Sequence, residues 1–122
     1  MQGNRGSGTK PEVVLRRALW HAGLRGYRVA WRAAEGSPDI AFVGRRLAVF
    51  VHGCYWHRCP KCRLPLPKTN TDYWRRKFER NVTRDARQRQ QLGEAGWTVL
   101  VFWECEVKAD ASSCAVRVAA KL

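Results

Sequence analysis

Three cysteines lie close together in one polar, proline-rich segment, residues 53–70. Cys54, Cys59 and Cys62 have the spacing Cys-x4-Cys-x2-Cys, in a segment with too few apolar residues to give the thiols a core to fill. Four thiolates form a closed tetrahedral Zn²⁺ site, in which the metal is structural. We predict such a site with Cys105 as its fourth ligand, while Cys114 is the alternative and is expected to pack as a small buried residue.

A second set of residues combines an acid with a histidine. Asp39 opens a strand predicted over residues 39–43, and His52 follows a strand predicted over residues 47–51. If these strands pair as a hairpin, the Asp39 carboxylate lies near His52 and near the Val51 carbonyl. Oxygen ligands of this kind suit Mg²⁺. The alternative is that Asp39 only serves the turn that precedes the strand.

His57 lies inside the cysteine segment and is a candidate general base, since neutral imidazole accepts protons near pH 7. Asp85 is its predicted partner, because a carboxylate on the inward face of a helix is costly unless it is paired. An ion pair of Asp85 with Arg89 is equally compatible with the spacing. Glu12 has two interpretations as well: it completes a helix cap at Thr9, or it faces the metal region.

Aromatic residues alternate with cations in two segments. Tyr55 and Trp56 lie in the cysteine segment, and Trp74 lies near the start of a long predicted helix. Aromatics among cations can insert between base pairs, although Trp74 could instead seal the loop against the helix. The same helix carries a lopsided set of cations that could contact phosphates: Arg75, Arg76, Lys77, Arg80, Arg84, Arg87 and Arg89.

The chain is short and strongly basic. Its 122 residues carry a formal net charge of +13, which indicates one domain and a polyanionic partner. No stretch approaches the roughly 18 apolar residues of a membrane span, and residues 1–10 lack a signal-peptide core. We therefore expect a cytoplasmic protein without a membrane partner, with residues 1–8 as a flexible basic arm and residues 9–122 as a single domain.

Hydrophobic periodicity and turn residues predict the elements that would position these groups. Trp20, Trp97 and Trp103 are expected in the core. The fold class is α/β, a mixed sheet flanked by helices. The expected helices cover residues 10–22, 72–95 and 110–122, and the expected strands cover residues 27–32, 39–43, 47–51 and 97–103.

Taken together, the motifs resemble those of the very short patch repair (Vsr) DNA mismatch endonucleases. The resemblance covers residues 9–107. The matching segments are Thr9-Lys-Pro-Glu12, Pro38-Asp39, Val51-His-Gly-Cys-Tyr-Trp-His57, Tyr73-Trp-x-x-Lys77-x-x-x-Asn81-x-x-Arg-Asp85, Gly96-Trp-x-Val and Trp103-Glu-Cys105.

The resemblance implies a restriction-endonuclease-like fold with a structural zinc site, and Mg²⁺-dependent nicking of one DNA strand 5′ to the thymine of a T·G mismatch that arises from deaminated 5-methylcytosine. By position, Asp39 and the Val51 carbonyl would bind Mg²⁺, and His57 would be the base held by Asp85. His52 would assist at the phosphate, and Glu12 would be a supporting acid. Cys54, Cys59, Cys62 and Cys105 would bind zinc. Contacts to DNA would come from Tyr55, Trp56, Trp74, Arg75, Lys77, Asn81 and Arg84.

The implied partner is double-stranded DNA carrying a mismatch, bound by a monomer in the bacterial nucleoid, with mismatch-repair proteins or a methyltransferase as further partners. Two alternatives stay open. The first is a sequence-specific or defence-associated nickase on the same fold. The second is a non-catalytic, zinc-stabilised DNA-binding module, which would leave Asp39, His57 and Asp85 unexplained.

Overall fold

The computed structural model describes residues 10–29, 31 and 37–122, so the predicted arm and the cap at Thr9 lie outside the described residues. Two of the helices are short: the 3-10 turn η1 and α3. The elements are α1 (Lys10–His21), β1 (Arg28–Val29), β2 (Ile40–Phe42), η1 (Val43–Arg45), β3 (Leu47–His52), α2 (Thr71–Glu94), β4 (Thr98–Trp103), α3 (Glu104–Ala109) and α4 (Ala111–Ala119).

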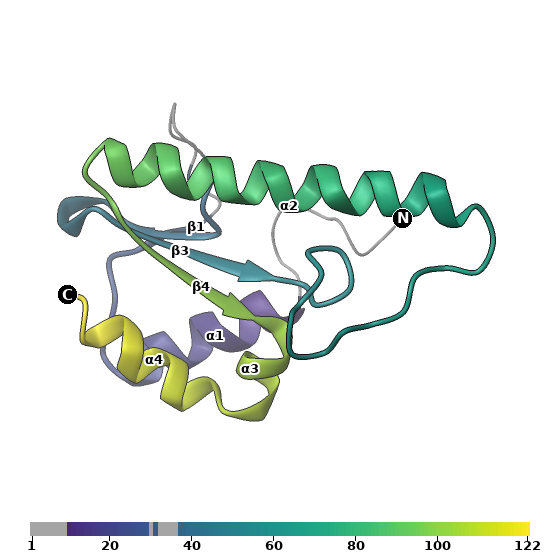
Figure 1. Cartoon of the computed structure of the whole chain (residues 1–122). Helices are drawn as coiled ribbons and strands as arrows, with labels where there is room; N and C mark the ends of the chain where they lie inside the picture. The colour runs from purple at the N-terminus through teal and green to yellow at the C-terminus, as the bar shows by residue number, and fades with distance from the viewer. Residues whose placement is uncertain (1–9, 30, 32–36) are drawn as a thin grey trace.

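The described strands form one mixed sheet in the order β1-β2-β3-β4. The pairs β1–β2 and β2–β3 are antiparallel, and β3 runs parallel to β4 from Leu47 opposite Thr98 to His52 opposite Trp103. Parallel neighbours need a long crossover, which α2 supplies here. The predicted mixed α/β fold is confirmed (Figure 1).

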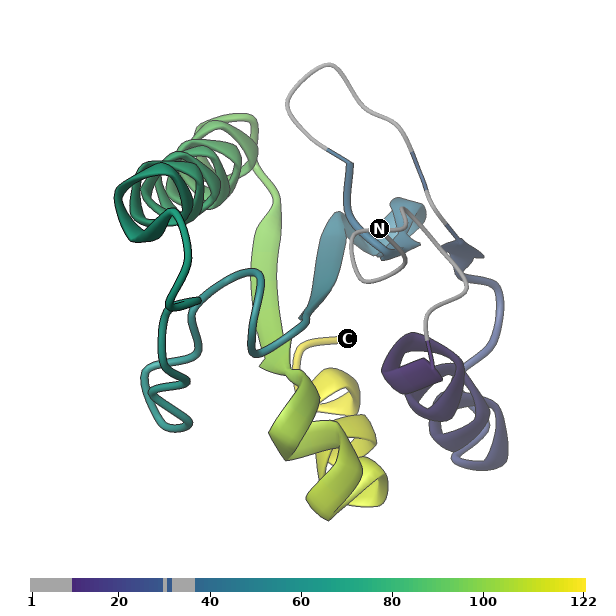
Figure 2. The ribbon, with the colours of Figure 1, turned by 90° about the vertical axis from the view of Figure 1, so that its right-hand side faces the viewer.

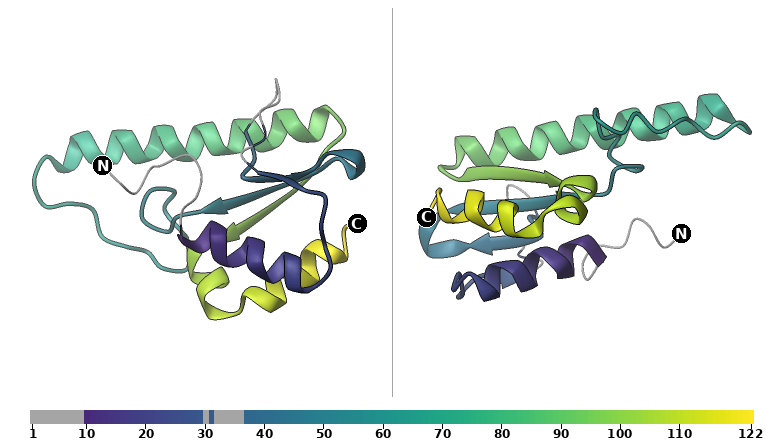
Figure 3. Two further views of the ribbon diagram at one scale, coloured as in Figure 1. Left: turned by 180° about the vertical axis from the view of Figure 1, so that it is seen from behind. Right: turned by 90° about the horizontal axis from the view of Figure 1, so that it is seen from below.

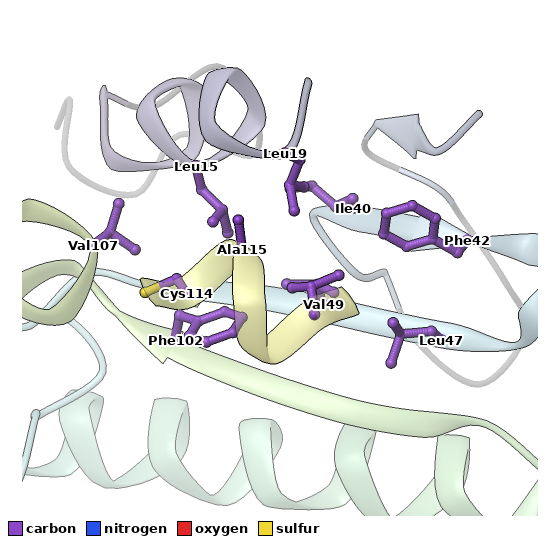
Figure 4. Packing of buried hydrophobic residues seen from close by; sticks show 11 residues of the cluster. Leu15, Leu19, Ile40, Phe42, Leu47, Val49, Phe102, Val107, Cys114 and Ala115 are labelled. Atoms are coloured by element: carbon purple, nitrogen blue, oxygen red, sulfur yellow. The ribbon is translucent and has the colours of Figure 1, made fainter. Parts of the chain in front are cut away.

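Helices cover both faces of the sheet. Helix α2 lies along one face, while α1, α3 and α4 pack on the other (Figures 2 and 3). Successive side chains of a strand point to opposite faces. Leu47 and Val49 of β3 accordingly lie in the core under α1 and α4 (Figure 4), and the partly buried Val51 packs against it. Ala48 and Phe50 pack on the side of α2. By the same alternation His52 faces α2.

Two expectations about the elements differ from the structure. Helix α3 is absent from the predicted set; it continues directly from β4, and the Glu106 carboxylate caps it by accepting the Trp103 N–H at 2.9 Å. Within the described residues the first strand covers only Arg28–Val29. Helix α4 begins as expected, since Asp110 accepts the Ser113 N–H at 3.1 Å.

The prediction that Trp20 belongs to the core is wrong. Its side chain is 51% exposed, and the Arg25 guanidinium lies 4.0 Å from the ring centroid, so a cation covers the ring that the core does not. Helix α2 begins without a side-chain cap, and Asn70, which precedes it, lies in the left-handed region (φ 56). No helix among residues 10–29 and 37–122 is long and apolar enough to cross a membrane, α2 being long but polar.

Candidate active site and zinc centre

The four predicted zinc ligands lie together in the structure. The Sγ atoms of Cys54, Cys59, Cys62 and Cys105 are within 4.8 Å of one another, and those of Cys59 and Cys105 are 3.8 Å apart. Zn–S bonds of about 2.3 Å in a tetrahedron give an S···S separation of about 3.8 Å, so the cluster has the size that zinc requires. Cys114 is buried in the hydrophobic core instead.

The backbone at Cys59 favours a thiolate. Burial opposes ionisation of Cys59, but hydrogen bonds from the backbone N–H groups of Cys62 and Lys61, together with side-chain bonds to Cys105 and Cys62, hold the pKa of this thiol below its ordinary value. Burial raises the pKa of the Cys54 thiol instead. The Cys105 N–H donates to Cys54 Sγ at 3.4 Å. Because α3 starts where β4 ends, its first turn carries Cys105 to the loop that holds the other three cysteines. A four-cysteine zinc site therefore fits these residues.

The loop also brings His57 to α2. Its Nδ1–H donates to Asp85 Oδ2 at 2.6 Å, and this bond together with the charge of His57 holds the pKa of Asp85 below its ordinary value although burial opposes the shift. The predicted pairing is therefore present, rather than the alternative with Arg89. With the proton on Nδ1, the Nε2 atom of His57 is the one that can accept a proton.

His52 lies flat against His57. The ring centroids are 4.1 Å apart with an interplanar angle of 6°, and the edge of Trp103 closes a further side. His52 is 4% exposed, and burial together with the positive charge of His57 lowers its pKa to about 4. His52 is consequently neutral near pH 7. Its Nδ1 has no hydrogen-bond partner within the described part of the chain.

His52, His57 and Asp85 are close enough together to suggest a second metal site. The geometry argues against it, because an imidazole nitrogen binds a metal along the plane of its own ring. Two parallel stacked rings direct their lone pairs side by side rather than at one point, and the Nδ1 of His57 is already occupied by Asp85. This arrangement suits proton transfer and phosphate contact better than chelation.

Asp39 lies at the start of β2, beside the end of β3. The hairpin pattern predicts that the Asp39 carboxylate lies near the Val51 carbonyl. In the structure Asp39 Oδ2 accepts the Val51 N–H at 2.7 Å, so the carboxylate binds the amide of the same residue. Burial raises the pKa of Asp39 to about 7, and the negative charges of Glu12 and Asp85 add to the rise. The charge of His57 also reaches Asp39, so the acid and the histidine share one site.

Glu12 reaches this site from α1. Its side chain is 1% exposed, and its charge acts on Asp39. A partner at Thr9 would lie outside the described residues. A buried and a partly buried acid that repel each other favour a bound divalent cation, and their oxygen atoms are the ligand type that Mg²⁺ prefers.

The aromatic residues pack against one another. The rings of Tyr55 and Trp56 lie 5.3 and 5.9 Å from that of Phe78, and Trp74 lies 5.9 Å from Phe78. Trp74 therefore helps to seal the loop against α2, as one of the two interpretations expects. Tyr55, Trp56 and Trp74 keep part of their surface exposed, whereas Phe78 is buried.

The polar and basic residues of α2 make different kinds of contact. Asn81 donates from Nδ2 to the Trp56 carbonyl at 3.2 Å, so its amide holds the loop in this structure. Arg75 pairs with Asp72 at 2.7 Å on the surface. The outer face of α2 is a shallow hollow with a strong excess of positive charge; it is lined by Arg76, Lys77, Glu79, Arg80, Asn81, Thr83, Arg84 and Arg87.

Several known proteins are similar in sequence to this chain. Residues 1–63 match the family described as DNA mismatch endonuclease Vsr. The type II nicking enzyme V.NaeI of Lentzea aerocolonigenes is 48% identical over 121 residues, which are 95% of this chain and 72% of the relative. The type II nicking enzyme V.XorIIP of Xanthomonas oryzae pv. oryzae is 44% identical over 108 residues, 88% and 78% of the two chains.

The DNA mismatch endonuclease Vsr of Escherichia coli is 38% identical over 82 residues, 67% of this chain and 53% of that relative. Fold, site and similarity define a strand-nicking DNA endonuclease. The chain belongs to the Vsr endonuclease family. The interpretation as a non-catalytic DNA-binding module is therefore wrong.

Proposed function

We propose that the protein is a Mg²⁺-dependent endonuclease that nicks one strand of double-stranded DNA at a defined sequence. The observation that carries the chemistry is the 2.6 Å hydrogen bond between His57 and Asp85, beside the partly buried Asp39 and the buried Glu12. The sequence-defined target rests on the names of the two relatives above, both of which are type II nicking enzymes.

In this proposal His57 is the general base. Asp85 fixes its ring and keeps the proton on Nδ1, so that Nε2 takes a proton from the attacking water. The products are a 3′-hydroxyl and a 5′-phosphate. His52, neutral and stacked on His57, lies where it can contact the scissile phosphate without competing for the proton.

Asp39 and Glu12 would hold Mg²⁺, with the Val51 carbonyl as a further oxygen ligand. When bound, the ion would offset the charge that develops on the phosphate and on the leaving oxygen. The two carboxylates gain from it too, since a divalent cation favours the ionised form of Asp39 against burial and against the charge of Glu12.

DNA would be bound by the aromatic cluster and α2. Tyr55, Trp56 and Trp74 are partly exposed and can stack on or insert between bases, with Phe78 as their buried support. Arg75, Lys77, Asn81 and Arg84 would contact the backbone. Insertion costs least where base pairs are weak, which gives the protein a means to select its site.

A second candidate target is the T·G mismatch. It is favoured by the family description and by the Escherichia coli relative, a DNA mismatch endonuclease. Under this alternative the same residues nick 5′ to the mismatched thymine, and mismatch-repair proteins or a methyltransferase would be partners. The chemistry is identical, so only the choice of DNA separates the two targets.

Substitution tests the chemistry. His57→Ala should reduce the Mg²⁺-dependent nicking rate at saturating DNA by about 10² or more, because a positioned base contributes that much. Asp39→Asn should abolish Mg²⁺-dependent nicking. His21→Ala, an exposed histidine of α1, is the matched control and should nick normally. An undiminished rate in His57→Ala would remove this residue from the mechanism.

A duplex library tests the target. Randomised duplexes, fully paired or with one T·G mismatch, are incubated with protein and Mg²⁺, and the nicks are mapped to the nucleotide. Nicking of paired DNA at one sequence supports the proposal, and nicking restricted to T·G duplexes supports the second candidate. Binding without cleavage of either pool contradicts both.

A further inference from the structure

Arg58 directly follows the proposed general base, and its side chain connects three parts of the site. Its Nη1 donates to the Tyr55 carbonyl at 3.2 Å, and its Nη2 donates to the Leu64 carbonyl. The guanidinium also covers Phe78 of α2, with Cζ 4.6 Å from the ring centroid. A planar group with five donors can bind two carbonyls and stack on a ring at once, which a lysine cannot do.

The backbone at Arg58 is unusual for a residue with a side chain. Its φ is 57°, in the left-handed region that favours glycine. Arg63 in the same loop shares this conformation (φ 47), but its side chain makes no hydrogen bond, ion pair or ring contact with the residues that the structure describes. The loop therefore contains one left-handed arginine that ties it together and one that does not.

His57 is restrained on the side that precedes it. Asn81 donates to the Trp56 carbonyl, and the His57 N–H donates to the Gly53 carbonyl at 3.1 Å. On the side that follows, the next zinc ligand is Cys59. Arg58 is the single residue between His57 and this ligand, and its side chain binds the turn through which the chain passes from one to the other.

We infer that Arg58 is a positioning residue for the nicking reaction. By binding the Tyr55 and Leu64 carbonyls under the ring of Phe78, it holds the loop in the path that keeps His57 in contact with Asp85. This inference rests on the proposed role of His57. It is separate from zinc binding, because the Arg58 guanidinium binds Tyr55, Leu64 and Phe78 rather than a cysteine.

Three variants test the inference: Arg58→Gln, Arg58→Gly and the control Arg63→Gln. The measurements are the single-turnover nicking rate at saturating DNA, the zinc content, and the downfield proton NMR signal of the His57–Asp85 hydrogen bond in the DNA-free protein, assigned by its loss in Asp85→Asn. Both Arg58 variants should lose at least about tenfold in rate and lose or broaden the signal while retaining zinc. Arg63→Gln should keep rate and signal.

Arg58→Gly separates the side chain from the backbone. Glycine relieves the left-handed conformation, so a loss equal to that of Arg58→Gln assigns the effect to the guanidinium. If both Arg58 variants keep rate and signal while His57→Ala is impaired, the inference is overturned and the proposed function stands. If they lose zinc in step with rate, Arg58 supports the zinc site and the inference is also overturned. An unimpaired His57→Ala contradicts the proposed function itself.

Discussion

At the scale of single residues, burial decides the charge that each titratable group carries. His52 and Asp39 lie at one end of the sheet, yet burial shifts their pKa values in opposite directions, to about 4 and about 7. Each shift disfavours the charged form. The site thus holds a neutral imidazole and a carboxyl group whose ionised form a bound cation would stabilise.

Because the pKa of His52 falls from its ordinary 6.5 to about 4 on folding, its contribution to stability is complete above pH 6.5 and is lost as the pH falls towards 4. The shift corresponds to at most about 3 kcal/mol. His52→Phe keeps a ring in the stack and removes the titration. In urea unfolding between pH 7 and pH 4, the free energy of unfolding should fall more steeply for the unsubstituted chain than for His52→Phe. Zinc release at low pH affects both proteins and therefore cancels in the comparison. Equal slopes would contradict the pKa shift.

At the scale of elements, sequence reasoning succeeded where a pattern is long or chemically specific. The long helix expected over residues 72–95 is present as α2, with Phe78 and Leu92 buried although Val82 is 45% exposed. It failed for α3, since six residues carry too little periodicity and the Glu106 cap is visible only after β4 is placed. Arg58 was missed for a similar reason: its partners include the carbonyls of Tyr55 and Leu64, which no side-chain pattern reveals.

Helix α3 also supports the zinc cluster. Glu104 Oε1 accepts the Cys54 N–H at 3.2 Å, and Lys108 at 2.9 Å holds the same carboxylate in place. Glu104→Ala removes this bond and should lower zinc affinity by about 10- to 100-fold, as loss of a group that orients a ligand does. Competition with a chromogenic chelator measures the change. Glu94→Ala, an exposed acid at the end of α2, is the control, and equal affinities would contradict the supporting role.

At the scale of the whole molecule, sheet topology explains why distant residues meet. Parallel β3 and β4 end at the same edge, which places His52 opposite Trp103 and the start of α3 next to the cysteine loop. Antiparallel β2 begins at that edge, so Asp39 is delivered there too. The loop that leaves β3 and the helix α2 that follows it then enclose the site from one face, and that helix carries the excess of positive charge along its outer side.

If the outer side of α2 binds DNA, its cations neutralise DNA phosphates, and the affinity for DNA must fall as the salt concentration rises. Each phosphate that is no longer neutralised should reduce the slope of log K against log salt by about 0.9. The triple change Arg80→Gln, Arg84→Gln and Arg87→Gln should therefore flatten the slope measured with a fluorescent duplex. Arg17→Gln with Lys121→Gln removes exposed charge from α1 and the C-terminus on the other side of the sheet. Equal slopes for the two variants, each taken per charge removed, would mean that net charge, and not the outer face of α2, attracts the DNA.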